Sequence, residues 1–84
     1  MARALVMQAT QALPHERHDV MARLRAKRAA ARAGGARYWV FEDPGYPGQF
    51  VEFYEARDAE TLRAARRVAG ERSPEETILL EVEL

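Results

Sequence analysis

Alternating apolar and polar positions indicate four short β-strands, because successive side chains of a strand point to opposite faces. We expect these strands at residues 3–10, 36–42, 50–56 and 77–83. The second and third segments are also rich in the aromatic and β-branched residues that favour strands. Residues 43–48 between them are dense in proline and glycine, so this pair of strands is predicted to form a hairpin.

Apolar positions spaced three and four residues apart predict two helices, at residues 14–33 and 59–69. Pro14 suits the first turn of the first helix, and the glycines at positions 34 and 35 suit its end. Asp58 is a suitable N-cap for the second helix, which Gly70 closes. The expected buried stripes are Val20, Met21, Leu24 and Ala31 in the first helix, and Leu62, Ala65, Val68 and Ala69 in the second.

The order strand, helix, strand, strand, helix, strand predicts an α+β fold of the ferredoxin-like type. Right-handed crossovers place both helices on one face of a four-stranded antiparallel sheet. A chain of 84 residues is expected to form one domain, residues 1–84, because it is too short for two independent cores. The face of the sheet that carries no helix is therefore where a functional surface is expected first.

The alternation within each strand predicts which residues this uncovered face receives. The residues expected toward the helices are Leu5, Met7, Val51, Phe53, Ile78, Leu80 and Val82. The residues expected on the uncovered face are Val6, Gln8, Thr10, Phe50, Glu52, Tyr54, Leu79, Glu81 and Glu83. In the second strand the outward residues are either Tyr38 and Val40 or Trp39 and Phe41. Such a face is too apolar for simple exposure, so we expect a second subunit, a ligand or both to cover it.

Four local segments carry a resemblance to a known superfamily: the aromatic strand at residues 38–42, the Pro-Gly hairpin, residues 50–55, and the acid-led helix start at residues 58–62. In this order they resemble the dimeric α+β barrel superfamily, especially its antibiotic-biosynthesis-monooxygenase-like domains. The resemblance implies a homodimer packed sheet against sheet, with a small organic molecule held between sheet and helices or between the two sheets.

For an enzyme, the same resemblance implies cofactor-independent oxygenation or a related proton transfer on an aromatic or polyketide-like compound. The alternative is a non-catalytic dimeric module that binds a ligand or another protein. Members of the superfamily often carry a histidine late in the second helix, and its haem-degrading branch uses an asparagine. The sequence has no asparagine, and neither histidine lies in the second helix, which favours the non-catalytic alternative.

Glu52 is the best sequence candidate for a catalytic acid or base. Inside a closed barrel its carboxyl group would be partly desolvated, which would raise its pKa and allow it to exchange a proton. The alternative is a carboxylate on a wet rim that pairs with an arginine of the second subunit. Gln8, Tyr38 and Tyr54 lie on neighbouring predicted strands, so we expect them to bind the ligand together with Glu52.

Composition argues against several other classes of function. The sequence has no cysteine, which excludes disulfides and thiolate chemistry and is typical of a cytoplasmic protein. No apolar run approaches the roughly 20 residues of a membrane-spanning helix. His15 and His18 have no third ligand nearby, so no metal is expected. No glycine-rich phosphate loop follows a strand, so no cofactor is expected.

Charge is distributed unevenly, although the formal net charge is zero. Residues 1–41 contain eight basic and two acidic residues, whereas residues 42–84 contain five basic and eleven acidic residues. Such asymmetry is typical of a partner surface. RNA-recognition domains share this order of elements, but the expected outward positions of Glu52, Glu81 and Glu83 would repel phosphate. We therefore expect no nucleic-acid partner.

Overall fold

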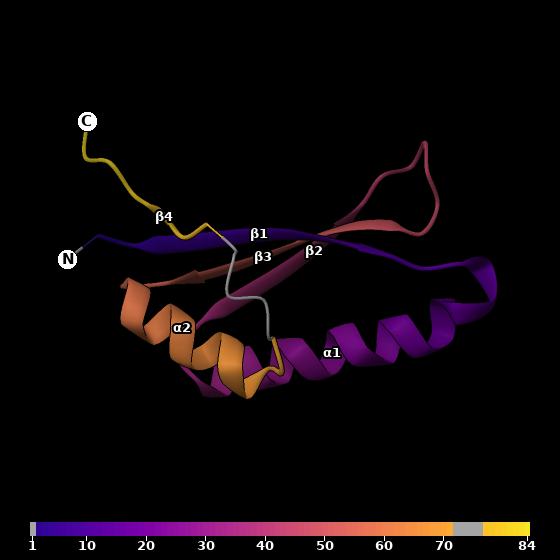
Figure 1. Cartoon of the computed structure of the whole chain (residues 1–84), viewed down its shortest axis with the longest axis horizontal. Helices are drawn as coiled ribbons and strands as arrows, with labels where there is room; N and C mark the ends of the chain where they lie inside the picture. The colour runs from indigo at the N-terminus through magenta and orange to yellow at the C-terminus, as the bar shows by residue number, and fades with distance from the viewer. Residues whose placement is uncertain (1, 72–76) are drawn as a thin grey trace.

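The fold consists of one four-stranded antiparallel sheet with two helices on one face, as the sequence predicts (Figure 1). The computed structural model describes residues 2–71 and 77–84. The strands are β1 (Ala4–Gln11), β2 (Arg37–Glu42), β3 (Gln49–Ala56) and β4 (Leu79–Leu80), and the helices are α1 (Arg17–Ala33) and α2 (Ala59–Val68). The strands lie in the order β2-β3-β1-β4 in the sheet. Helix α1 connects β1 to β2 and helix α2 connects β3 to β4, which is the ferredoxin-like arrangement.

The helix ends follow local capping rules. A single 3-10 turn, Pro14–Glu16, precedes α1, so the predicted start at Pro14 is a tighter turn than expected. Gly35 has a φ of +87° directly after the C-cap of α1, a conformation that glycine adopts without strain. Asp58 caps α2 as predicted, because its Oδ1 accepts a hydrogen bond from the backbone N–H of Thr61 at 2.7 Å.

In the predicted stripe of α1, Val20, Leu24 and Ala31 are buried and Met21 is half-buried. In α2, Leu62 and Ala65 are buried as predicted, but Val68 is 66% exposed and the prediction for it is wrong. Arg66 is buried in its place. Helix α2 is rotated so that the Arg66 guanidinium lies over the ring of Tyr54, 5.6 Å from the ring centroid.

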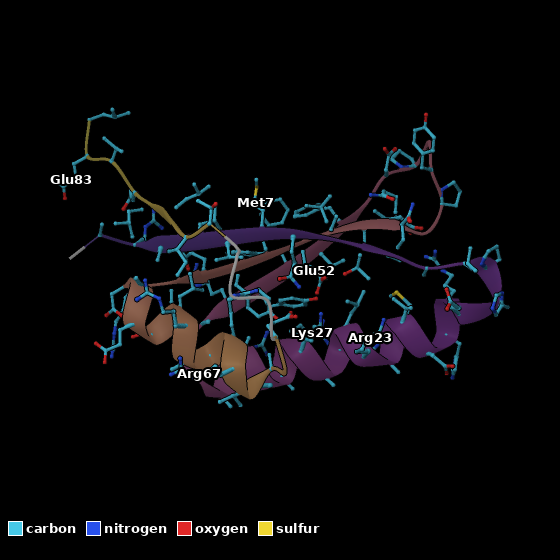
Figure 2. All side chains as sticks on the ribbon, viewed as in Figure 1. Met7, Arg23, Lys27, Glu52, Arg67 and Glu83 are labelled. Carbon is cyan, nitrogen blue, oxygen red and sulfur yellow. The ribbon has the colours of Figure 1, made fainter. Side chains whose placement is uncertain are left out.

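The predicted facing of β1 and β3 is wrong by one residue. The buried alternate positions are Ala4 and Val6 in β1, and Phe50, Glu52, Tyr54 and Ala56 in β3. Figure 2 shows Glu52 between the sheet and the helices and Met7 on the opposite, uncovered side. In β2 the choice is settled in favour of Tyr38 toward the helices, where it is buried, with Trp39 and Phe41 outward. The large apolar residues on the uncovered face are therefore Leu5, Met7, Trp39, Phe41, Val51, Phe53 and Leu79, and Arg37 and Glu55 lie on the same face.

The last strand is shorter than the predicted segment 77–83. Only Leu79 and Leu80 pair with β1, opposite Leu5 and Ala4 respectively. Because β1 begins at Ala4, the chain beyond Leu80 has no strand opposite it, and Val82 is 74% exposed rather than turned toward the helices. The pairing does place Leu79 on the uncovered face, as expected. The sequence also predicts a loop at Ser73 and Pro74, and these two residues lie outside the described ones.

The two helices cover unequal lengths of the sheet, because α1 has 17 residues and α2 has 10. Helix α2 packs against β1 and β3 at one end, and the first half of α1 extends alone under the other end (Figure 1). The core is accordingly divided into a cluster around Tyr54 and Leu62 and a second one around Leu24 and Phe50. Within residues 2–71 and 77–84, no helix is long and apolar enough to cross a membrane.

Candidate functional site

A cluster of charged and polar side chains lies between the sheet and the helices, where an apolar core would be expected. Its centre is Glu52 of β3, which has no exposed surface. The Glu52 carboxylate accepts hydrogen bonds from four side chains, those of Lys27 at 2.9 Å, Tyr38 at 2.5 Å, Gln8 at 3.1 Å and Thr10. Donors from α1, β1 and β2 thus surround one carboxylate, which is how a buried charge avoids the cost of losing water.

A second carboxylate, that of Glu71 just after α2, completes the cluster. Its Oε2 accepts hydrogen bonds from the Tyr54 hydroxyl at 2.6 Å and from Gln8 Nε2 at 2.8 Å. The Oε1 atom of Gln8 accepts a hydrogen bond from Arg66 at 2.9 Å. The Gln8 amide therefore joins both carboxylates to the cation of α2.

Lys27 lies between the two carboxylates, with its Nζ 2.9 Å from Glu52 and 3.0 Å from Glu71. Its side chain is only 13% exposed. Among the described residues, Lys27 and Arg66 supply two cations for the two carboxylates of the cluster. A nearby opposite charge and hydrogen bonds to the charged groups are the conditions under which buried charge is tolerated.

The pKa values of the cluster show how strongly the surroundings fix its protonation. Burial raises the pKa of Glu52, but hydrogen bonds from Thr10, Tyr38, Lys27 and Gln8 outweigh burial and the pKa is lowered. Burial also raises the pKa of Tyr38, and its hydrogen bond to Glu52 raises it further. The pKa of Tyr54 is raised by burial and by its bond to Glu71. The Glu52 carboxylate therefore stays charged, and the phenols of Tyr38 and Tyr54 stay neutral, at physiological pH.

The four residues predicted to bind a ligand are all brought together here: Gln8, Tyr38, Glu52 and Tyr54. They meet on the helix side of the sheet rather than on the uncovered face. The expected raised pKa of Glu52 is wrong in direction, because the four donors were not foreseen. The rim alternative is wrong as well, since the cation beside Glu52 is Lys27 of the same chain in a closed interior. Ligand binding by these residues stays a prediction.

Sequence reasoning missed the helix residues of the cluster, although a signal for them exists. Lys27 lies three residues after Leu24 and four before Ala31, which places it within the buried stripe of α1. Arg66 likewise lies four residues after Leu62 in α2. Two cations on the inward sides of two helices need carboxylates beside them in the interior. This need indicates that the side chain of Glu52 faces the helices.

A cleft of about 390 Å³ opens beside this cluster, between the first half of α1 and strand β2. It lies where α2 does not reach. Its lining comprises Arg17, Met21, Leu24, Arg25 and Arg28 of α1, Tyr38, Trp39, Val40 and Glu42 of β2, and Phe50 of β3. Tyr38 belongs to both features, because its ring lines the cleft while its hydroxyl is bonded to Glu52. A volume of this size is in the range of pockets for small molecules.

An ion pair holds one end of the cleft. Arg17 donates two hydrogen bonds to the Glu42 carboxylate, at 2.7 and 2.8 Å, and its guanidinium lies 5.5 Å from the centroid of the Phe50 ring. Glu42 also accepts a bond from the backbone N–H of Gly48 at 2.9 Å. These bonds lower the pKa of Glu42 to about 2, with the hydrogen bond from Arg17 as the largest cause.

Other sequence candidates lie away from this region. His15 and His18 are both exposed, the first in the 3-10 turn and the second near the start of α1. In the part of the chain that the structure describes, no three histidine or acidic side chains are grouped so as to hold a metal ion.

Comparison with known proteins establishes the fold and nothing finer. No protein-family model matches the chain, and no curated protein matches it significantly in sequence. Solved structures that superpose on it include that of Rv0793 from Mycobacterium tuberculosis, with 20% identity, a TM-score of 0.68, and coverage of 99% of this chain and 96% of that one. PA3566 from Pseudomonas aeruginosa matches with 19% identity, a TM-score of 0.70, and coverage of 100% and 96%. A conserved protein from Methanosarcina mazei Go1 matches with 16% identity, a TM-score of 0.69, and coverage of 96% and 92%.

Proposed function

We propose that this chain forms a homodimer in which each subunit binds a small organic molecule in the cleft between α1 and β2. The observation that carries the proposal is the cleft itself, about 390 Å³ in volume, with Met21, Val40 and Phe50 among its apolar lining. Pockets for small molecules combine an apolar lining with a few placed polar groups. Arg25 and Arg28 of α1, which also line the cleft, supply such groups.

The uncovered face of the sheet supports the homodimer. Met7 is 52% exposed, Phe41 is 61% exposed, and they share this face with Trp39 and Phe53. Apolar patches on a single sheet face mark interaction surfaces, and a domain this small gains stability from additional burial. A second copy of the chain is the simplest partner, because a two-fold axis brings the same apolar patch to both sides of the contact.

Membership of the dimeric α+β barrel superfamily is part of the proposal, supported by the ferredoxin-like fold and this apolar face. A cytoplasmic location is supported by the absence of cysteine.

Acid–base catalysis by Glu52 is not part of the proposal. A carboxylate with a lowered pKa and four hydrogen-bond donors is a poor proton acceptor at neutral pH. Oxygenation of the bound molecule stays a prediction.

Native mass spectrometry of the purified protein tests ligand binding, combined with a cleft-filling variant. Met21→Trp should occupy the cleft and abolish retention of a copurified small molecule. Val68→Trp is the matched control, because Val68 is exposed on α2 and does not line the cleft. Absence of a retained molecule in the wild-type protein, or unchanged retention in Met21→Trp, would contradict binding in this cleft.

Sedimentation velocity tests the homodimer separately. Phe41→Asp places a charge on the apolar face and should convert a dimer into a monomer. Val68→Asp introduces the same charge on α2 and should leave the dimer intact. A wild-type protein that sediments as a monomer at micromolar concentration would rule the homodimer out.

A further inference from the structure

The cleft between α1 and β2 has cationic groups above an apolar floor. Met21, Leu24 and Phe50 contribute apolar surface, while Arg25 and Arg28 extend from α1 at its rim. Both arginines are exposed. Being three residues apart, they lie on the same side of the helix, so both guanidinium groups can approach one bound group.

Neither Arg25 nor Arg28 forms an ion pair within residues 2–71 and 77–84. This separates them from Arg17, which is bound to Glu42 at the end of the same cleft. An arginine already paired with a carboxylate has little to offer a ligand, whereas two unpaired ones above an apolar floor form an anion-binding pair.

The acidic groups near the cleft do not oppose an anion. Glu42 lines the cleft, but its charge is matched by Arg17. Glu52 accepts a hydrogen bond from the Tyr38 hydroxyl, and its charge is matched by Lys27. The uncompensated charge facing the cleft is therefore that of Arg25 and Arg28.

We propose that the molecule bound in the cleft is planar and apolar with one carboxylate, its ring against Met21, Val40 and Phe50 and its carboxylate on Arg25 and Arg28. This inference rests on the proposed function, because it specifies the ligand of the same cleft. Guanidinium groups recognise carboxylates through paired, charge-assisted hydrogen bonds, and apolar side chains receive a ring of the size that the cleft admits.

The experiment compares 1-naphthoate with its neutral analogue 1-naphthamide by titration into the ¹⁵N-labelled protein. Amide shifts should change along α1 and β2, and naphthoate should bind at least about ten-fold more tightly than naphthamide. The double variant Arg25→Gln/Arg28→Gln should remove this preference and leave naphthamide binding unchanged. Arg23→Gln is the control, because Arg23 is an exposed arginine of α1 that does not line the cleft.

The outcomes separate this inference from the proposed function. Equal binding of the two compounds, or an equal loss of affinity in Arg23→Gln, would overturn the carboxylate and leave small-molecule binding standing. Shift changes confined to other surfaces, or no binding of either compound, would overturn the inference. The proposed function would then be decided by the copurified molecule and Met21→Trp. The dispersion of amide shifts in each variant verifies that the fold is retained.

Discussion

Lys27→Met is the most direct test of the interior that the structure describes. The substitution keeps the length and apolar stem of the side chain and removes only the ammonium group. In the wild type this group lies 2.9 Å from Glu52 and 3.0 Å from Glu71. Its removal leaves two carboxylates facing a single cation, Arg66, in a region where Glu52 has no contact with water.

The expected cost follows from the burial of both partners. Breaking a buried ion pair by removing one member costs about 3–5 kcal/mol, because the remaining charge is desolvated without compensation. Lys27 is only 13% exposed, so little of this cost is relieved by solvent. A domain of this size has a total stability of roughly 5–10 kcal/mol, so the variant should lose a third of it or more.

The double variant Lys27→Met/Glu52→Gln distinguishes loss of charge balance from loss of packing. It removes one cation and one anion together, so the balance of positive and negative charge in the cluster is kept. We therefore expect it to be more stable than the sum of the two single variants predicts, with a coupling of about 1–3 kcal/mol. Urea denaturation at pH 7 provides all four free energies of unfolding.

Arg23→Met is the matched control, because Arg23 is an exposed cation on the same helix. It should change the free energy of unfolding by no more than about 0.5 kcal/mol. A Lys27→Met variant as stable as Arg23→Met would refute the reasoning, since Lys27 would then behave as a surface residue. Additive effects of Lys27→Met and Glu52→Gln would refute the ion pair itself.

Three further predictions concern acid stability, a turn and a helix cap. The folded pKa of Glu52 lies below its unfolded value of 4.5. The stabilisation that Glu52 contributes is therefore present above pH 4.5 and is lost as the pH falls through the folded pKa. Between pH 7 and pH 3, the free energy of unfolding measured with urea should decline less in Glu52→Gln than in the wild type. Gly48→Ala should cost at least about 2 kcal/mol, since its φ is +93° and the new Cβ would lie 2.1 Å from the Ala12 carbonyl oxygen. Gly70 has a φ of +88°, but no atom lies within 4 Å of the position of a new Cβ, so Gly70→Ala should cost only about 1 kcal/mol. Equal losses of stability in Gly48→Ala and Gly70→Ala, measured by urea denaturation, would contradict the close approach at Gly48. Asp58→Ala should lower Tm by roughly 4–8 °C and Asp58→Asn by much less, as measured by thermal circular dichroism; equal values would mean that the side-chain cap does not stabilise α2.

The order and bounds of the elements were predictable because they depend on local signals. Caps, glycines and periodicity act within a few residues of the position they determine, and Asp58 and Gly35 both occupy the expected positions. The last strand was overestimated for a non-local reason. A strand needs a partner, and whether β1 extends far enough to pair with Val82 is a property of the assembled sheet.

The facing of β1 and β3 was not predictable from alternation alone, because both alternate sets of β3 contain aromatic residues. Phe50 and Tyr54 belong to one set and Phe53 to the other. Alternation with Val51 and Phe53 inward places Glu52 on the uncovered face. The structure has the opposite facing, and Lys27 of α1 supplies a cation beside the inward carboxylate of Glu52.

Turning Glu52 inward has a consequence for the whole surface. The same one-residue change of facing that buries a carboxylate also moves Met7 and Phe53 outward. The buried polar cluster and the exposed apolar face of the sheet therefore both follow from which alternate residues of β1 and β3 face the helices. Stability of the subunit then depends on the hydrogen bonds around Glu52, whereas the apolar face is the surface of the proposed homodimer contact.

Trp39 connects the two surfaces on which the proposals rest. It is 42% exposed and belongs to the outward set of β2, yet it also lines the cleft beneath the edge of that strand. Strand β2 is an edge strand, so a large side chain on its outer face can reach around to the helix side. Covering the uncovered face with a second subunit would restrict the rotamers of Trp39 and so change one wall of each cleft. Assembly and ligand affinity should therefore be coupled, with the Phe41→Asp monomer binding 1-naphthoate more weakly than the dimer although Phe41 does not line the cleft.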